Sequence, residues 1–352
     1  MMEPMKFRKN GLYNIVNVNS GNLAVVKDAS KENYAPIIQF DKRGTDNEKF
    51  VFFPLDSKGK SQTYAIAAYH SGKIICVKDA STENYAPIIQ FNWNNTTNEQ
   101  WNIIPDNSWG YNIVNQNSGN LAVVKDASKE NYAPIIQFDK RGTMNEDWKF
   151  QEVSWFPVPE TPTVETLPKA PQFNDVHQNL PQVTDEILTG YAMIPCIMVR
   201  DHNWSDESKM KTSPYYILKK YQFWELLASF QLFNGETQKR TYKVGMNMTD
   251  QRSMENSIGT MIGADAGFQF DGLTDAIKSE ITTSLKVAIS RETKLMTEET
   301  GEVIRENKTG KLQAYAEYVC VSKFVLERTD GTEVASWTMS NPNTISKTVF
   351  PG

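Results

Sequence analysis

Three sets of polar and aromatic side chains recur along the first half of the 352-residue sequence and form its clearest chemical pattern. Each set combines a carboxylate, two amides, a phenylalanine and a loop tyrosine. These groups accept or donate hydrogen bonds, or present an apolar ring face to a ligand. The members are Asp28, Tyr34, Gln39, Phe40 and Asn47; Asp79, Tyr85, Gln90, Phe91 and Asn98; and Asp126, Tyr132, Gln137, Phe138 and Asn145.

Residues that could support catalysis are scattered instead. The three histidines, His70, His177 and His202, lie far apart in the sequence and form no His-Glu-x-x-His motif. Glu298 and Glu299 are adjacent, so an alternating strand would direct them to opposite faces. A Gly-x-Ser-x-Gly elbow, a phosphate-binding loop and a Glu-x-Glu pair do not occur. We therefore expect neither an enzyme nor a metal or organic cofactor.

Composition limits the class of protein further. The net charge of -5 argues against a nucleic-acid partner, which would require a basic face. With 39% hydrophobic and 22% charged residues, the chain has a globular composition and a length suited to about two domains. The first eleven residues lack the apolar core of a secretory signal peptide, so we expect none. No apolar run is long enough for a membrane-spanning helix.

The first half of the chain is organised by a repeat of about 50 residues. Residues 20–40 and 118–138 are identical, SGNLAVVKDASKENYAPIIQF, and residues 71–91 form a third copy. Each copy contains about four short β-rich runs separated by turn residues. Three copies of four strands favour a closed β-trefoil, because a propeller usually needs four or more blades and a solenoid needs atypical ends. We expect Phe50, Trp101 and Trp148, near the ends of the copies, to fill the shared core.

Cysteine usage agrees with a core role. The chain has three cysteines, Cys76, Cys196 and Cys320, and an odd number forms no complete disulfide framework. Cys76 takes the place that Val25 and Val123 hold in the other copies. It is therefore expected to be a small core residue.

The Asn-Glu-x-Trp tails at 98–101 and 145–148 resemble the Gln-x-Trp signature of ricin-B-type lectin trefoils. The resemblance implies carbohydrate binding, in which the carboxylate and amide bind sugar hydroxyls and a ring stacks on the sugar. The pattern departs from the family at Val26, Val77 and Val124, where ricin-type lobes place their aspartate. Asp28 and its equivalents could therefore cap turns instead of binding sugar. If the sugar pocket is shifted towards the loop that contains Tyr34, this tyrosine and its equivalents would supply the stacking ring. The uniform KDAS and ENYA residues fit either a binding role or a recent duplication.

The second half has another character. We expect a trefoil domain over residues 1–153, a proline-rich linker over 154–189 that lies extended on the surface, and a β-rich domain over 190–352. Strands are expected at 192–199, 215–218, 241–244 and 315–326, with a hairpin turn at Asp330-Gly331 before a strand at 334–339.

Two longer runs, 258–270 and 281–290, alternate apolar residues with small or polar ones, and 271–280 reads as a loop. Each run reaches the length of a transmembrane β-strand, about 9 to 11 residues. A single molecule could not place such a hairpin in lipid, because the backbone groups at the hairpin's edges would be unpaired. Several molecules whose hairpins close into a barrel would have no unpaired edges. An ordinary antiparallel sheet with one buried face shows the same alternation. The apolar side of the predicted hairpin, at about 257–291, is Ile258, Ile262, Phe268, Phe270, Ile281, Leu285, Val287 and Ile289.

Four segments, MIPCIMV (193–199), MKTSPYY (210–216), YQFW (221–224) and IGADAGF (262–268), resemble the C-terminal module of Bin-like insecticidal crystal toxins of the Tpp group. The resemblance covers residues 190–352. It implies an all-β chain, with an N-terminal β-trefoil followed by an elongated, aerolysin-like antiparallel β-sheet domain. It also implies binding to glycans or glycolipids on insect gut cells, oligomerisation, and a pore in the target membrane.

The same resemblance implies where the protein acts and with what. It places the chain in the parasporal crystal of a sporulating bacterium, as a homodimer there, and then outside the cell as a homo-oligomer inserted in the host membrane. A partner toxin is a further expectation. Gut proteases would trim the ends, Met1–Lys9 and the tail after Asn341. A non-lytic carbohydrate-binding lectin, or the receptor-binding subunit of a two-component toxin, remains the alternative.

Overall fold

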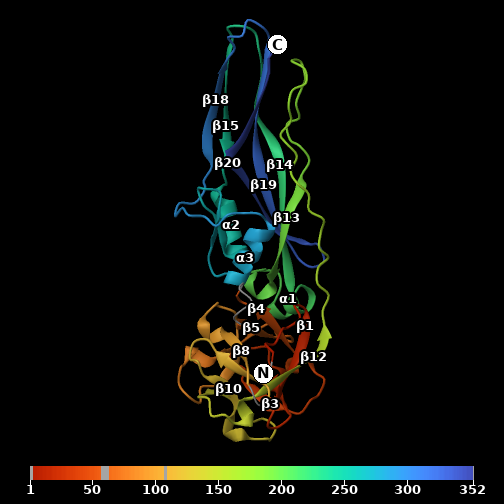
Figure 1. Cartoon of the computed structure of the whole chain (residues 1–352), viewed down its shortest axis with the longest axis vertical. Helices are drawn as coiled ribbons and strands as arrows, with labels where there is room; N and C mark the ends of the chain where they lie inside the picture. Colours follow the sequence, from red (N-terminus) through yellow and green to blue (C-terminus); the bar gives the residue numbers. More distant parts are fainter. Residues whose placement is uncertain (1–2, 57–62, 107–108, 352) are drawn as a thin grey trace. The chain divides into compact units, whose positions relative to one another are not determined.

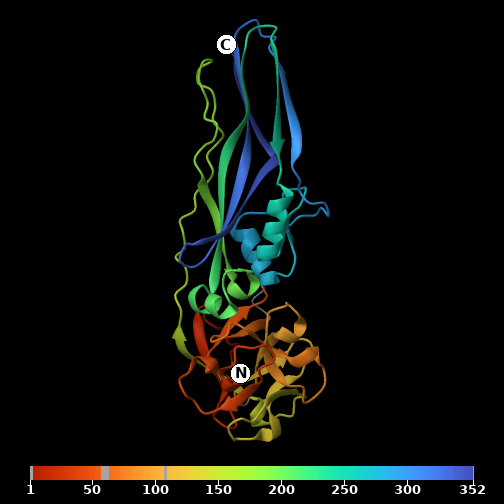
Figure 2. The same ribbon diagram turned by 180° about the vertical axis from the view of Figure 1, so that it is seen from behind.

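The structure is a computed structural model that describes residues 3–56, 63–106 and 109–351 (Figures 1 and 2). The chain forms two compact units. Unit 1 comprises Met1–Pro159, Ile194–Tyr216 and Gly272–Glu280, and unit 2 comprises Glu160–Met193, Ile217–Asp271 and Ile281–Gly352. Nearly all regular structure is β-strand, which confirms the predicted all-β class. Among the described residues, no helix has the length and apolar character needed to cross a membrane.

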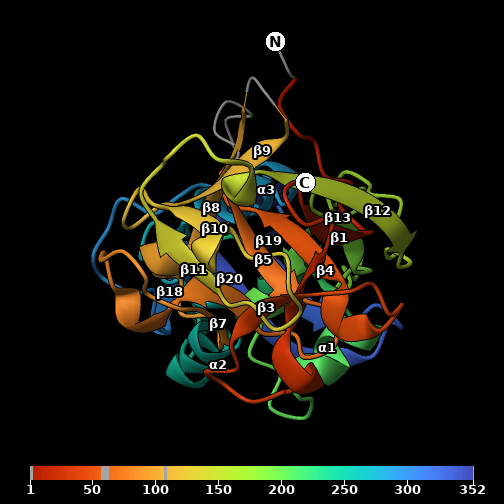
Figure 3. The ribbon, with the colours of Figure 1, turned by 90° about the horizontal axis from the view of Figure 1, so that it is seen from below.

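Unit 1 contains a twelve-stranded antiparallel sheet to which each copy of the repeat contributes four strands (Figure 3). The first and last strands pair antiparallel over their whole length and close the ring. The predicted β-trefoil is confirmed. The strands are β1 (Gly11–Asn17), β2 (Leu23–Val26), β3 (Ile37–Phe40) and β4 (Phe50–Pro54); β5 (Thr63–Ala68), β6 (Ile74–Val77), β7 (Ile88–Phe91) and β8 (Gln100–Pro105); and β9 (Tyr111–Asn115), β10 (Leu121–Val124), β11 (Ile135–Phe138) and β12 (Trp148–Trp155).

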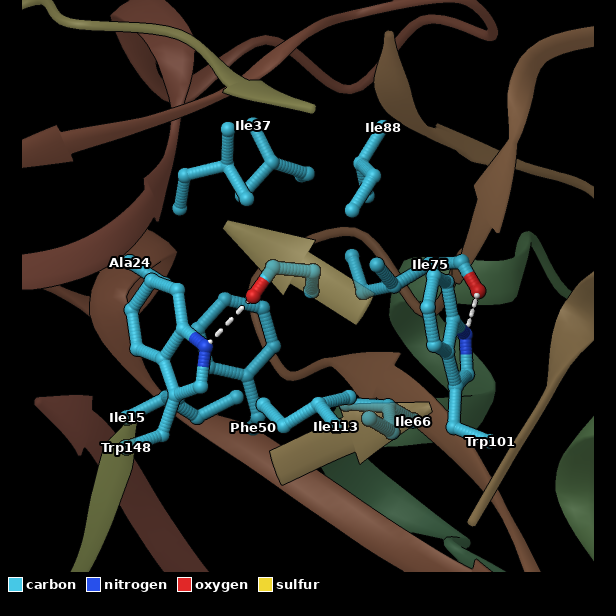
Figure 4. A pocket seen from close by; sticks show the side chains of 12 residues that line it. Ile15, Ala24, Ile37, Phe50, Ile66, Ile75, Ile88, Trp101, Ile113 and Trp148 are labelled. Atoms are coloured by element: carbon cyan, nitrogen blue, oxygen red, sulfur yellow. Dashed lines mark hydrogen bonds between the residues drawn. The ribbon is translucent and has the colours of Figure 1, made fainter. Parts of the chain in front are cut away.

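The inside of the trefoil is apolar and threefold repeated (Figure 4). Phe50, Trp101 and Trp148 are buried there, as predicted. The indole nitrogens of Trp101 and Trp148 donate to the carbonyl oxygens of Ile75 and Ala122, each at 2.8 Å. A cavity of about 30 Å³ remains in the centre of this core. Four positions from each copy line it, namely Ile15, Ala24, Ile37 and Phe50; Ile66, Ile75, Ile88 and Trp101; and Ile113, Ala122, Ile135 and Trp148.

Cys76 lies in the same domain and is buried, which confirms its predicted core role. Burial raises the pKa of its thiol to about 12. The thiol is therefore uncharged at neutral pH and behaves as a small apolar side chain.

Three buried glutamines join the copies of the repeat to one another. Gln39 of the first copy donates from Nε2 to the carbonyl oxygens of Ser128 and Glu130 in the third copy, at 2.9 and 2.8 Å. Its Oε1 accepts from the Ser20 hydroxyl at 2.8 Å. The equivalent bonds run from Gln90 to Ser30 and Glu32 of the first copy, and from Gln137 to Ser81 and Glu83 of the second copy. Each copy is thus tied to the next in a closed ring.

The carbonyl oxygens in this ring belong to the loops with the uniform KDAS and ENYA residues. Their backbone must follow the same path in all three copies to meet the glutamines, because each Nε2 group donates to two of these carbonyl oxygens. The contact between copies therefore supplies a packing reason for the uniformity of these loops, beside the binding role and the recent duplication.

Unit 2 is built on a sheet with strand order β13-β14-β19-β20. The strands are β13 (Ile187–Pro195), β14 (Tyr215–Leu232), β19 (Gln313–Glu327) and β20 (Glu333–Pro351). A separate pair, β15 (Thr237–Val244) and β18 (Glu299–Glu306), is also antiparallel. The strands predicted at 215–218, 241–244, 315–326 and 334–339 are confirmed within longer strands. The strand predicted at 192–199 ends at Pro195, and a 3-10 turn, Cys196–Met198, follows it.

The proline-rich segment has no helix or strand between Trp155 and Ile187. Its part within unit 2 is held by apolar contacts, because Phe173 and Leu180 are buried in a cluster with Leu226 and Tyr318. The Tyr318 hydroxyl also donates to the carbonyl oxygen of Pro181 at 2.6 Å. This segment therefore covers part of the sheet.

The predicted pair of long strands over 258–270 and 281–290 is wrong for this structure. The region forms α2 (Met248–Ile258), β16 (Thr260–Ile262), β17 (Phe268–Phe270) and α3 (Asp275–Ser284). Ile258 ends α2, Ile262 lies in β16, and Phe268 and Phe270 lie in β17. The first run is interrupted by a tight turn, in which the Gly263 N–H donates to the carbonyl oxygen of Gly267 and Ala266 is left-handed with φ of 62°.

Only the start of the second run, residues 281–284, is helical, and its apolar spacing fits two periods. Ile281 and Leu285 are four residues apart, which satisfies both a strand and a helix. Ile277 lies four residues earlier, in the stretch expected to be a loop, and all three side chains are buried. Val287 and Ile289 follow the helix, and Ile289 is exposed. The polar residues Ser279 and Thr283 stand at the alternate positions between the three buried residues and are exposed, which fits a helix and not a strand with one buried face.

The two chain ends expected to be cut by gut proteases differ in structure. Residues 3–9 form no strand or helix and most of them are exposed, although the Phe7 ring stacks on Phe52 with centroids 3.8 Å apart. After Asn341, β20 pairs with β19 again from Ile345 to Pro351, beyond an irregularity of the ladder. Cleavage at Met1–Lys9 and after Asn341 stays a prediction.

One buried carboxylate distinguishes the third copy. Asp147 is 4% exposed and accepts a hydrogen bond from the Asn112 amide at 2.8 Å. Burial, with Asp106 and Glu146 nearby, raises the pKa of Asp147 from 3.8 to about 6. Above pH 6 the folded state therefore holds a poorly solvated negative charge.

We expect Gln137→Met to lower the free energy of unfolding by about 2 kcal/mol, because the carbonyl oxygens of Ser81 and Glu83 lose their donor. The measurement is urea unfolding followed by tryptophan fluorescence. The exposed residue Lys129 of the same copy provides the control, Lys129→Met, which should change the stability by less than about 0.5 kcal/mol. Equal midpoints for the two variants would contradict the role of the glutamine ring.

We expect Asp147→Asn to stabilise the chain at pH 7.5 by about 2 kcal/mol and to have no such effect at pH 3.5. The folded pKa lies above the unfolded value, so the native carboxylate opposes folding as pH rises from about 4 to 6. Thermal melts across this range check the prediction. The exposed Glu130→Gln serves as control, and a pH-independent effect of Asp147→Asn would contradict the assignment.

Candidate functional site

A hollow of about 220 Å³ opens on the first copy of the trefoil, around the end of β2 and the turns that follow β2 and β3. Its floor is apolar and its rim is polar. All but one of the lining residues come from the first copy, and the exception, Tyr132, comes from the third. They are Val25, Val26, Asp28, Ala29, Ile38, Phe40, Asp41, Arg43, Thr45, Asn47, Glu48 and Tyr132.

Asp28 lies in the 3-10 turn Lys27–Ala29 with left-handed backbone, φ of 55°, and Ala29 follows with φ of 49°. Two successive left-handed residues that are not glycine are costly, at about 1 to 3 kcal/mol each. Asp28 is exposed, and within the described residues its carboxylate makes no hydrogen bond or ion pair. The alternative that Asp28 caps its turn is therefore not supported. Asp79 and Asp126 have the same left-handed conformation.

Tyr132 contributes the ring of this hollow from the neighbouring copy. Its backbone is also left-handed, with φ of 68°, and 58% of its surface is exposed. The ring meets Phe40 edge-on, with centroids 4.8 Å apart. The other two tyrosines do the same across the next copies, Tyr34 with Phe91 at 5.0 Å and Tyr85 with Phe138 at 4.8 Å.

The structure therefore regroups the residues that the sequence singled out. Each phenylalanine is paired with the tyrosine of another copy, which could not be read from the linear order. The resulting sets are Asp28, Phe40, Asn47 and Tyr132; Asp79, Phe91, Asn98 and Tyr34; and Asp126, Phe138, Asn145 and Tyr85.

The amide residues have internal roles. Gln39, Gln90 and Gln137 are fully buried and serve the ring of bonds between copies, so they lie outside the hollows. The amide nitrogen of Asn47 donates to the carbonyl oxygen of Val26 at 2.8 Å. Asn98 and Asn145 bond Val77 and Val124 in the same way. These asparagines shape the floor by holding the end of the second strand of each copy.

Two charged residues at the rim were missed by the sequence reasoning. The Arg43 guanidinium lies 5.1 Å from the Phe40 ring centre and 3.9 Å from the Asp41 carboxylate. Asp41 is fixed in turn by the Asn131 side chain, which donates to Asp41 Oδ2 at 2.9 Å. Arg43 stands between the repeat and its Asn-Glu tail, where attention to the repeat alone overlooked it.

The three copies differ at this rim. Arg141 of the third copy also lies over its phenylalanine, at 5.2 Å from the Phe138 ring centre, and next to Asp139. The second copy has Asn92 and Asn94 at these two positions. Because one cation and one anion are lost together, the net charge of the rim is the same in all copies. Asp28, Asp79 and Asp126 remain the carboxylates without an internal partner.

This arrangement suits a neutral ligand rich in hydroxyl groups. The carboxylate can accept hydrogen bonds, and the tyrosine and phenylalanine present ring surface to an apolar patch of the ligand. Within residues 3–56, 63–106 and 109–351, no cluster of three His, Cys, Asp or Glu side chains could hold a metal ion.

Comparisons with known proteins cover both halves of the chain. Residues 187–352 match a family described as Insecticidal Crystal Toxin, P42, and residues 6–91 and 46–138 match ricin-type beta-trefoil lectin-like domains. The binary larvicide subunit BinA of Lysinibacillus sphaericus is 33% identical over 203 residues, which are 57% of this chain and 55% of BinA. Insecticidal crystal protein Cry35Ab1 of Bacillus thuringiensis is 30% identical over 204 residues, which are 55% of this chain and 53% of Cry35Ab1.

The chain thus spans about half the length of the curated relatives it matches. The structural similarity covers more of the chain than the sequence similarity does. The crystal structure of Cry35Ab1 superposes on it with a TM-score of 0.82, over 98% of this chain and 91% of that chain, at 24% identity. Both halves of the chain therefore share the fold of that protein.

We expect glycine at the three left-handed aspartates to stabilise the trefoil. In the variant with Asp28→Gly, Asp79→Gly and Asp126→Gly, the positive φ carries no steric penalty, so each site should gain about 0.5 to 1 kcal/mol. Thermal unfolding measures the gain. A matched variant with Lys27, Lys78 and Lys125 replaced by glycine should gain nothing, and a loss of stability in the aspartate variant would show that these carboxylates hold the fold.

Proposed function

We propose that the protein is an insecticidal pore-forming toxin, because residues 187–352 match the family described as Insecticidal Crystal Toxin, P42. In this proposal the trefoil, residues 1–153, binds glycans or glycolipids on gut epithelial cells. Residues 190–352, connected through 154–189, oligomerise and form the pore. The proposal includes no catalytic activity.

The observation that carries the binding role is the composite hollow. In the first copy Phe40 and the cross-copy Tyr132 line the same hollow as Asp28, whose carboxylate has no partner among the described residues, and the repeat places the same residue types in the other two copies. The carboxylate and the tyrosine of each set sit in strained backbone. Strain of this kind persists where the surroundings enforce it, and it concentrates at binding sites. A single shallow sugar site binds at about the millimolar level. Three sites on one rigid domain would gain about 100-fold or more on a dense glycan layer.

The pore role rests on the segment at about 257–291. Apolar residues such as Ile262 and Leu285 alternate there with glycine, serine and threonine. We propose that this segment changes from α2, β16, β17 and α3 into a two-stranded hairpin at the membrane. Several copies would have to join their hairpins, because one hairpin alone would leave unpaired backbone groups in lipid.

Partners and location follow as parts of the same proposal. BinA is named as a subunit of a binary larvicide and Cry35Ab1 as a crystal protein. We propose storage in a parasporal crystal, with a homodimer there, then release and insertion in the host membrane as a homo-oligomer, with a partner toxin as a further component.

A second candidate function is binding without lysis, as a lectin or as the receptor-binding subunit of a two-component toxin. The folded state of the 257–291 segment favours it, because Ile262, Phe268 and Leu285 are fully buried and would have to leave their packing before insertion.

We expect the chain to release dye from liposomes that carry gut glycolipids, and competing sugar should suppress the release. The aspartate-to-glycine variant should lose at least tenfold in liposome binding and in leakage, because it lacks the three free carboxylates. The lysine-to-glycine variant is the matched control and should retain both. Binding without leakage, with and without protease treatment, would support the lectin and contradict the pore.

A further inference from the structure

One end of the trefoil barrel is lined by rings from all three copies. Tyr13, Tyr64 and Tyr111 occupy equivalent positions at the starts of β1, β5 and β9, each two residues before an isoleucine of the inner cavity. Phe52, Ile103 and Phe150 occupy equivalent positions in β4, β8 and β12. Inward-facing residues alternate along a strand, so these six form the next layer outward. We call this layer, Tyr13, Phe52, Tyr64, Ile103, Tyr111 and Phe150, the aromatic cup.

Among the described residues, the Phe7 ring fills the cup from outside the repeat, and Met5 packs against the same core. The Phe7 ring stacks on Phe52, with centroids 3.8 Å apart and planes 1° apart. It meets Tyr13, Tyr64 and Phe150 edge-on, each at 5.0 Å. These partners belong to all three copies, so Phe7 lies near the threefold axis.

Symmetry explains why the occupant comes from elsewhere in the chain. A residue of the repeat occurs three times, and three rings cannot share one position on the axis. The repeat therefore builds a site for one apolar ring that it cannot fill itself. Stacked and edge-on rings at these distances are worth about 0.5 to 1.5 kcal/mol per pair beyond their burial.

The segment that carries Phe7, Glu3–Lys9, forms no strand or helix. Phe7 and Met5 pack on the core, the Tyr111 hydroxyl donates to the Glu3 carbonyl oxygen at 3.1 Å, and the Arg8 N–H donates to the Tyr13 hydroxyl at 2.8 Å. An exposed ion pair joins Arg8 to Glu152 at 3.3 Å, and the Lys9 carbonyl oxygen accepts from the Tyr215 hydroxyl at 2.9 Å. The connection of the segment to β1 is a turn closed by the Gly11 N–H and the Arg8 carbonyl oxygen at 3.0 Å. The segment can therefore leave the cup without breaking any pairing within the sheet.

We propose that the aromatic cup is a binding site for the N-terminal segment of a second copy of this chain, and that two copies pair by exchanging Phe7. The second molecule carries the same Met-Lys-Phe sequence that fits the cup within one chain. The hinge is the stretch from Phe7 to Lys9, because hydrogen bonds to Tyr215 and Phe156 hold the Lys9 carbonyl oxygen and Asn10. Exchange through a short hinge is a low-cost route to a dimer. The inference stands apart from glycan binding and from pore formation.

The test shortens the hinge. Deleting Arg8 and Lys9 removes about 7 Å of chain, so Phe7 no longer reaches its own cup but still reaches that of another molecule. Light scattering after gel filtration should show a dimer for the deletion variant and a monomer for the same variant with Phe7→Ala. A synthetic peptide of residues 3–9 should return the dimer to monomer, and the peptide with alanine at position 7 should not.

A folded deletion variant that stays monomeric at about 100 μM would overturn the proposal, as would a dimer that survives Phe7→Ala. If the deletion variant does not fold, the full-length chain gives the decision. Held at high concentration just below its melting temperature and then cooled, it should trap a dimer that Phe7→Ala abolishes. The absence of such a dimer would overturn the proposal equally.

Discussion

The trefoil depends on side-chain amides that are buried between its copies. A glutamine amide from one copy replaces water as the donor to two carbonyl oxygens of another, and the three glutamines complete a cycle. A buried carbonyl oxygen without a donor costs about 1 to 3 kcal/mol. The cycle therefore stabilises only the closed arrangement of three copies, because an open array would leave one loop without its glutamine.

The same bonds position the candidate binding residues. Gln90 holds the carbonyl oxygens of Ser30 and Glu32, and these residues lie between the left-handed Asp28 and the left-handed Tyr34. The loop is fixed between its strained residues, so the strain is balanced by bonds that the fold needs anyway. A site built in this way is rigid before a ligand arrives, which reduces the entropy cost of binding.

Much of this architecture could be predicted from the sequence because it follows from local repetition. Identical copies with four β-rich runs indicate a trefoil, and the recurring Trp101 and Trp148 indicate its core. The pairing of Tyr132 with Phe40 could not be predicted, because it depends on how a loop of one copy leans on the next. Gln39 looked like a ligand residue for the same reason, since only the closed ring reveals the carbonyl oxygens that its amide meets.

The prediction of long strands at 258–270 and 281–290 was wrong for the folded chain for a different reason. Ile281 and Leu285 have a spacing common to both periods, and Ile277 was assigned to a loop because its neighbours are polar. A strand places alternate residues on one face, whereas a helix places every third or fourth there. Ser279 and Thr283 distinguish the two here, because a strand would place them on the same face as Ile277, Ile281 and Leu285, whereas both are exposed. The ambiguity is itself informative, since a segment whose apolar residues suit both periods can bury them as a helix in one environment and as a strand in another.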